Sequence, residues 1–122
     1  MSLAKTVNSR LPRTSDVCPL FKMMILLKKK STFTDEEFAN YWLGTHAPLA
    51  KRMPGLRKYV VNVVKRPPNR EPEYHGVVEL WFDDSAGMKS AFGSSEGIAT
   101  QKDTPAFTDS LTTMYIDEHV IM

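Results

Sequence analysis

The sequence predicts an α+β domain of the ferredoxin-like βαββαβ type, with a four-stranded antiparallel sheet and its helices on one face. Four segments carry the alternating or β-branched pattern of strands, and the segments between them begin with helix-capping residues. Their order is strand, helix, strand, strand, helix, strand, as in the split βαβ motif. For a chain of 122 residues we expect one domain over residues 18–122, preceded by a flexible arm over residues 1–17.

The first strand and the first helix have clear local signals. The strand is predicted over residues 21–28, where the middle of the segment is apolar on both faces, as in strands that are covered on both sides. The helix is predicted over residues 35–44. Thr34 and Glu37 have the spacing of a capping box, and the acidic residues of the first turn favour the positive end of the helix dipole.

Pro48 is expected to interrupt this helix. Proline disfavours helical geometry at the residue before it, so we expect a break near residues 45–47. Pro48 itself suits the first turn of a helix, which predicts a short second helix over residues 48–53. Pro54 and Gly55 then end that helix as a turn.

The rest of the chain repeats the same two signals, with β-branched residues in the strands and acidic or hydroxyl caps before helices. These signals predict strands over residues 56–65, 74–82 and 110–121, and helices over residues 86–92 and 98–107. A proline-rich segment over residues 66–72 is predicted to be a hairpin loop, and residues 93–97 a break between helices. These connections complete the predicted βαββαβ order.

The predicted helices can cover only one face of the sheet. Several strand residues on the other face are apolar, among them Met24, Leu26, Val60 and Val64 or their neighbours, depending on the register. An apolar sheet face of that size is uncommon on a soluble monomer. We therefore expect a homodimer in which the two subunits pack sheet against sheet.

The composition excludes several classes of function. The formal net charge of +2 is too small to predict a nucleic-acid or membrane partner, and no run of 18 apolar residues marks a membrane span. Cys18 is the only cysteine, which fits a reducing cytoplasm. We find no metal-ligand spacing, glycine-rich nucleotide loop or Gly-x-Ser-x-Gly motif, so we expect neither a metal nor a cofactor.

His46 is the most informative candidate functional residue. It follows Phe38 and Trp42 at intervals of four residues, which puts all three on one broad face of a helix. Phe38 and Trp42 should enter the core, and His46 should lie at the rim, where the expected helix break can open a pocket. An imidazole there suits proton transfer or the orientation of a polar ligand. The alternative is a histidine at the core edge that hydrogen-bonds a backbone carbonyl.

Several motifs of the chain together resemble a known family. They are Phe38-Ala39-Asn40-Tyr41-Trp42, His46-Ala47-Pro48-Leu49, Pro54-Gly55-Leu56 with Tyr59, and Glu79-Leu80-Trp81-Phe82 before an acidic helix cap. Over about residues 20–120 the chain resembles the EthD family, named for ethyl tert-butyl ether degradation, of the dimeric α+β barrel superfamily. The resemblance implies a dimer of ferredoxin-like subunits. It also implies relatives among proteins of ether breakdown, methylmuconolactone isomerases, and cofactor-free oxygenases, cyclases and decarboxylases.

The resemblance strengthens His46 as a catalytic candidate, acting as a proton shuttle or as a hydrogen-bond donor to a carbonyl or enolate oxygen. Two more candidates come from the strands. One is Glu79, because burial would raise the pKa of its carboxyl, and the other is Tyr59, because its phenol could reach the same cavity. Glu79 could instead form a salt bridge with a basic residue of a neighbouring strand, such as Lys58, and Tyr59 could be an ordinary sheet aromatic. The substrate-binding candidates are Trp42, Trp81, Asn62 and Met23.

Two functions are compatible with these residues. The first is a small cofactor-independent catabolic enzyme, an isomerase, lyase or oxidoreductase, that acts on an oxygenated or aromatic small molecule. The second is a non-catalytic accessory protein that binds a small molecule of an oxidative, ether-type degradation pathway. The two differ in whether His46 and a second acid/base group converge on one cavity.

Overall fold

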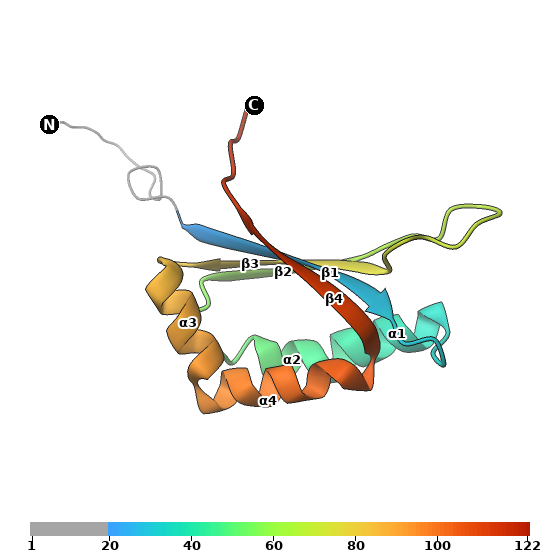
Figure 1. Ribbon diagram of the computed structural model, residues 1–122, viewed down its shortest axis with the longest axis horizontal. Coiled ribbons are helices and arrows are strands. Elements are labelled where there is room, and N and C mark those ends of the chain that lie inside the picture. Colours follow the sequence, from blue (N-terminus) through green and yellow to red (C-terminus); the bar gives the residue numbers. More distant parts are fainter. Residues whose placement is uncertain (1–19) are drawn as a thin grey trace, which may run out of the picture.

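The computed structural model describes residues 20–122, and the arm expected over residues 1–17 lies outside the described residues. One sheet forms the first layer of the molecule, and the helices form the second (Figure 1). The elements in chain order are β1 (Phe21–Lys29), α1 (Asp35–Tyr41), the π-helix η2 (Trp42–His46), α2 (Ala47–Ala50), β2 (Lys58–Val63), β3 (Gly76–Phe82), α3 (Ser85–Gly93), α4 (Ser95–Asp103), the 3₁₀-helix η3 (Thr104–Ala106) and β4 (Thr108–Ile116).

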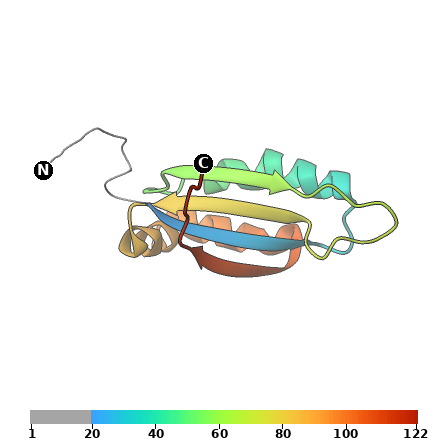
Figure 2. The same cartoon turned by 90° about the horizontal axis from the view of Figure 1, so that it is seen from above.

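The sheet has four strands in the order β2-β3-β1-β4, and each strand is antiparallel to its neighbours. Seen from above, the helices all lie on the same side of the sheet (Figure 2). Two βαβ units that interleave in this way give the ferredoxin-like arrangement. The predicted fold class is therefore confirmed.

The start of α1 is the predicted capping box. The Thr34 hydroxyl accepts a hydrogen bond from the Glu37 N–H at 3.0 Å, and the Glu37 carboxylate accepts one from the Thr34 N–H at 2.8 Å. Two N–H groups that the helix cannot satisfy by itself are thus paired. This fixes where the helical segment begins and which of its faces meets the sheet, with Phe38 buried.

The expected helix break near residues 45–47 is wrong. The chain stays helical from α1 through the π-helix η2 into α2, and Ala47 has right-handed helical angles although a proline follows it. The Ala47 N–H bonds to the carbonyl of Trp42, five residues back. This wider turn accommodates Pro48, which lacks an N–H and would otherwise crowd the preceding turn. The proline therefore alters the type of helix and does not end it.

Several predicted boundaries shift by a few residues. The strand predicted over residues 56–65 is the shorter β2, and the strand predicted over residues 110–121 begins earlier and ends earlier, as β4. The break predicted over residues 93–97 is largely helical. The Ser94 hydroxyl accepts a hydrogen bond from the Gly97 N–H at 3.0 Å, so Ser94 caps α4 as soon as α3 ends.

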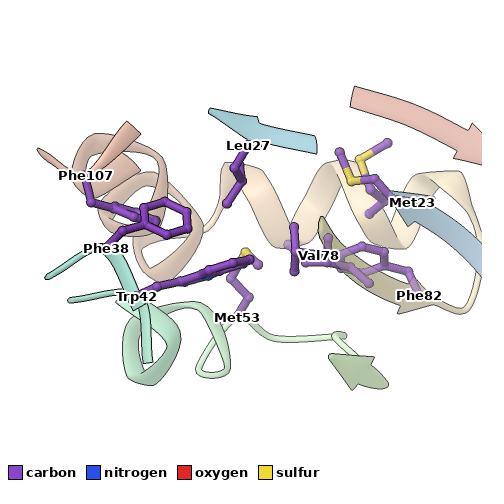
Figure 3. Close-up of a cluster of buried hydrophobic side chains, with 11 residues drawn as sticks. Met23, Leu27, Phe38, Trp42, Met53, Val78, Phe82 and Phe107 are labelled. Carbon is purple, nitrogen blue, oxygen red and sulfur yellow. The ribbon is translucent and has the colours of Figure 1, made fainter. Parts of the chain in front are cut away.

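The core lies between the sheet and the helices. Phe38, Trp42 and Phe107 form an aromatic cluster at one end, and Met23 and Phe82 lie at the other (Figure 3). The Trp42 ring packs so closely under β3 that a Cβ atom built on Gly76 would lie 2.3 Å from it. Only glycine at this strand position lets the indole enter the core.

The outer face of the sheet, opposite the helices, is partly apolar. The half-buried apolar side chains of this face are Met24, Leu26, Val60, Val77, Met114 and Ile116. A charged cluster occupies one end of it, around Lys22, which is 6% exposed. The Lys22 ammonium lies 3.0 Å from the Glu79 carboxylate and 3.3 Å from that of Glu118. Within the described residues, no helix covers this face.

Candidate functional site

A cavity of about 560 Å³ lies between the sheet and the helices. That volume falls within the range of small-molecule sites in proteins. Most of its wall is apolar and comes from the four strands and the helices. The apolar lining residues are Met23, Ile25, Leu27, Trp42, Ala50, Met53, Val78, Leu80, Met88, Phe92, Phe107 and Leu111. The polar groups are fewer, so each of them has a large effect on what can bind.

His46 is one of these polar groups. Its side chain lines the cavity and is largely buried, and its ring centroid lies 4.7 Å from that of Phe107. The residue stands at the end of η2, so the wide helical turn sets its direction. π-Helical turns of this kind are frequent at functional sites.

Asp103 holds the His46 ring in place. Oδ2 of Asp103 lies 2.9 Å from Nδ1 of His46, and its Oδ1 accepts a hydrogen bond of 2.7 Å from the hydroxyl of Tyr41. A carboxylate can only accept, so Nδ1 is the protonated nitrogen of the neutral ring. Within residues 20–122 no protein group hydrogen-bonds Nε2, which is therefore the nitrogen available to a ligand in the cavity.

Asp103 was not among the residues singled out from the sequence. It lies 57 positions from His46, at the end of α4, and no local motif connects the two. One weak signal exists, because Asp103 is four residues before Phe107 and three after the buried Thr100. Such spacing puts Asp103 on the core side of a helix, where a carboxylate is costly without a partner.

Tyr59 lines the same cavity as His46. In the sheet register Tyr59 is opposite Leu80, Leu80 is opposite Met23, and Met23 is opposite Tyr115, so these four side chains form one row across the inner face. Burial raises the pKa of Tyr59, and a hydrogen bond with the Trp42 side chain partly opposes that shift. The phenol is thus a hydrogen-bond donor at neutral pH.

Glu79 does not lie in this cavity. It is opposite Val60 in the register, on the outer face of the sheet, whereas Tyr59 faces inward. The pKa of this carboxyl is lowered, first by the Lys22 ammonium and then by the Asn62 amide. The Asn62 amide donates a hydrogen bond to Glu79 at 3.0 Å. The expectation that burial would raise the pKa of Glu79 is therefore wrong. Its salt bridge is formed with Lys22 of β1 and not with Lys58.

The substrate-binding candidates also divide between the two faces. Trp42 and Met23 line the cavity. Asn62 and Trp81 lie on the outer face, where the Asn62 amide bonds Val77 and Glu79, and the Trp81 ring stands between the ammonium groups of Lys22 and Lys58. The structure thus brings His46, Tyr59, Trp42 and Met23 together and separates Glu79, Trp81 and Asn62 from them.

No group of three or more His, Cys, Asp or Glu side chains in residues 20–122 is arranged to hold a metal ion. Of the helices in that same range, none combines the length and apolarity needed to cross a membrane.

The fold and the cavity together define a ferredoxin-like α+β protein with a small-molecule-sized cavity beneath its sheet. The family model of the EthD domain matches residues 30–111, which is more than half of the chain. The chain belongs to the EthD family, and the resemblance found in its motifs is confirmed.

Individual proteins are also similar to this chain. The crystal structure of an ethyl tert-butyl ether degradation family protein from Bacillus halodurans is 29% identical, with a TM-score of 0.71 over 82% of this chain and 99% of that one. A dimeric ferredoxin-like protein from Bacteroides fragilis is 16% identical, with a TM-score of 0.63 over 81% and 96% of the two chains. An 11.0 kDa protein from the thcB-thcC intergenic region of Rhodococcus erythropolis is 22% identical over 70% of this chain and 84% of that protein.

Proposed function

We propose that the protein is an enzyme that transfers a proton within an oxygenated small molecule held in the cavity, with His46 as the acid/base. One observation carries the proposal. The buried imidazole has its Nδ1 fixed by Asp103, and its other nitrogen is available to a ligand in a mostly apolar cavity. A carboxylate that orients a histidine in this way also stabilises the imidazolium that forms when the ring accepts a proton.

The residues suit chemistry at a carbon next to a carbonyl. In the proposed reaction Nε2 of His46 takes the proton from that carbon, and the electron pair of the C–H bond forms an enolate. The Tyr59 hydroxyl, which lines the same cavity from the sheet side, donates a hydrogen bond to the enolate oxygen. The imidazolium returns the proton to another carbon of the conjugated system. The substrate is isomerised, and no atom or electron is gained or lost.

The apolar wall supports the proposal in a second way. Trp42, Met23 and their neighbours exclude water from the reacting carbon. Electrostatic interactions are stronger in such surroundings than in water, so the His46–Asp103 pair can stabilise more of the charge that develops during proton transfer. The bound molecule should therefore be an oxygenated compound with a substantial apolar or aromatic part.

Solvent hydrogen exchange tests this function without knowledge of the natural substrate. The protein is incubated in D₂O with a panel of unsaturated lactones, ketones and phenols, and NMR follows deuterium entering the carbon next to the oxygenated group. The wild type should accelerate exchange in at least one compound. His46→Gln, which keeps a hydrogen-bonding group but cannot shuttle a proton near neutral pH, should reduce the rate to background.

His119→Gln is the matched control, because His119 lies on the exposed segment after β4 and its side chain is 73% exposed. This variant should exchange at the wild-type rate. If the wild type binds members of the panel but exchanges none of them, the accessory-protein function is favoured and the enzymatic proposal fails.

We also propose that the working form is a homodimer that packs through the outer face. The half-buried apolar side chains there support it, as does the charged cluster, which carries both signs and can therefore be self-complementary across a two-fold axis. Glu79, Trp81 and Asn62 would then belong to the subunit interface and not to the substrate site.

A further inference from the structure

The cavity opens along one side of the molecule. Its lining residues on the inner strands, η2 and α2 are mostly buried, whereas those on β4 are exposed, with Leu111 at 44% and Tyr115 at 62%. The lining residues Lys89 and Gly93 of α3 are exposed as well. β4 is one of the two edge strands and lies on the same side of the molecule as α4 (Figure 2). A ligand therefore enters between β4 and the two helices α3 and α4.

Lys89 is the one lysine among the cavity residues, and no arginine is among them. No carboxylate lines the cavity with it. Within residues 20–122 its ammonium forms no salt bridge, in contrast to Lys22 on the outer face. The nearby Gln101 amide is already committed, because it donates to the carbonyls of Phe92 at 2.9 Å and Gly97 at 3.1 Å. Lys89 is therefore the cation available to a ligand at the entrance.

Lys89 and His46 stand at opposite ends of the cavity. α3, which carries Lys89, follows the end of β3 at Phe82, and Phe82 packs against Phe92 of the same helix. His46 packs against Phe107, and the Phe107 carbonyl bonds the N–H of Lys30 just beyond the far end of β1. Figure 3 shows Phe82 and Phe107 at the two ends of the core. The space between the cation and the imidazole is mostly apolar.

We infer that the ligand of this cavity is a small organic acid, with an apolar body and one carboxylate. This inference rests on the proposed function and adds the substrate class to it. The carboxylate pairs with Lys89 at the entrance, the apolar body fills the middle, and the reacting carbon meets His46 at the inner end. No carboxylate among the lining residues competes for the Lys89 ammonium at the entrance, which favours an anion there over a neutral compound of the same shape.

A matched pair of probes tests the inference. Phenylbutanoate and phenylbutanol have the same apolar body, and only the first carries a carboxylate. Titration calorimetry at low salt should show that the wild type binds the acid about tenfold more tightly than the alcohol, as expected for one charge-assisted contact. Lys89→Met should bring the two affinities together by weakening the acid alone. Lys89→Arg should keep the preference.

Lys65→Met is the control, since it removes the same charge from the exposed connection between β2 and β3, away from the cavity. It should retain the full preference for the acid. Three outcomes would each overturn the inference. The wild type could bind both probes with equal affinity, it could fail to bind the acid, or the preference for the acid could survive in Lys89→Met. The proposed function is judged separately, because His46→Gln should abolish hydrogen exchange and leave the ratio of the two affinities unchanged.

Discussion

At the scale of single residues, Asp103 has the largest influence on the candidate site. Its two carboxylate oxygens bind Tyr41 and His46, so one side chain links α1, η2 and α4 at the cavity. The hydrogen bond with Asp103, and then burial, raise the pKa of Tyr41, which keeps that hydroxyl protonated as a donor. Asp103 is a positioning residue in this arrangement, because it acts on the substrate through His46.

Asp103→Asn should slow His46-dependent hydrogen exchange by at least about tenfold, because an amide can hold the ring but cannot stabilise the imidazolium. Tyr41→Phe should have a smaller effect, since the carboxylate remains. Both variants should bind the acid probe as the wild type does. NMR exchange rates measured across pH would separate this role from a structural one. An Asp103→Asn protein with the wild-type rate and pH profile would contradict it.

The Glu79 carboxylate on the outer face leads to a prediction about stability. Lys22, and then Asn62, lower the pKa of Glu79 below its ordinary value of 4.5. A carboxyl with a depressed folded-state pKa stabilises the protein above its unfolded-state pKa, and that contribution is lost as pH falls through the folded-state pKa. Urea denaturation of Glu79→Gln should therefore show a smaller loss of stability below about pH 4.5 than the wild type. If the stability of the two proteins fell identically with pH, the Glu79–Lys22 pair would contribute nothing to the free energy of unfolding.

At the scale of elements, the contact between α1–η2 and β3 depends on one glycine. A methyl group at Gly76 would lie 2.3 Å from the Trp42 ring. Gly76→Ala should therefore shift the indole or the strand and destabilise the protein by about 1–3 kcal/mol, the usual range for overpacking. Because Trp42 also lines the cavity, the affinity for the probes should change as well.

Gly44→Ala is the matched control. A Cβ atom at Gly44 meets nothing within 4 Å, and the residue lies within η2. Alanine is the better helix former, so this variant should be neutral or more stable by up to about 1 kcal/mol. Thermal melting of the two proteins gives the comparison. A Gly76→Ala protein that melts with the wild type would show that the ring moves aside freely.

At the scale of the whole molecule, the main prediction concerns assembly. Light scattering at micromolar concentration should give about twice the chain mass of 13.8 kDa. Val60→Glu should produce monomers, because Val60 is an apolar residue of the outer face, halfway along the edge strand β2, and a new carboxylate there would be desolvated in the dimer. Leu43→Glu, on the helical side at a residue that is 55% exposed, should remain dimeric. A wild-type monomer would contradict the sheet-to-sheet assembly.

Local signals in the sequence determined the order of the elements and much of the core. The capping box at Thr34, the turn at Gly55 and the spacing of Phe38, Trp42 and His46 involve residues close in the chain, so their interactions form whatever the distant segments do. The fold class followed from these signals. So did the expectation that His46 lies beside the core, although its chemical role stays a prediction.

The tertiary structure alone decided the composition of the site. Side chains alternate along a strand, so a register shift of one residue would exchange the faces of Tyr59 and Val60, and only the pairing of Tyr59 with Leu80 puts the phenol in the cavity and Glu79 outside it. Asp103 reaches His46 only because α4 docks beside η2. Such long-range contacts form when elements pack together, and no stretch of the chain encodes them locally.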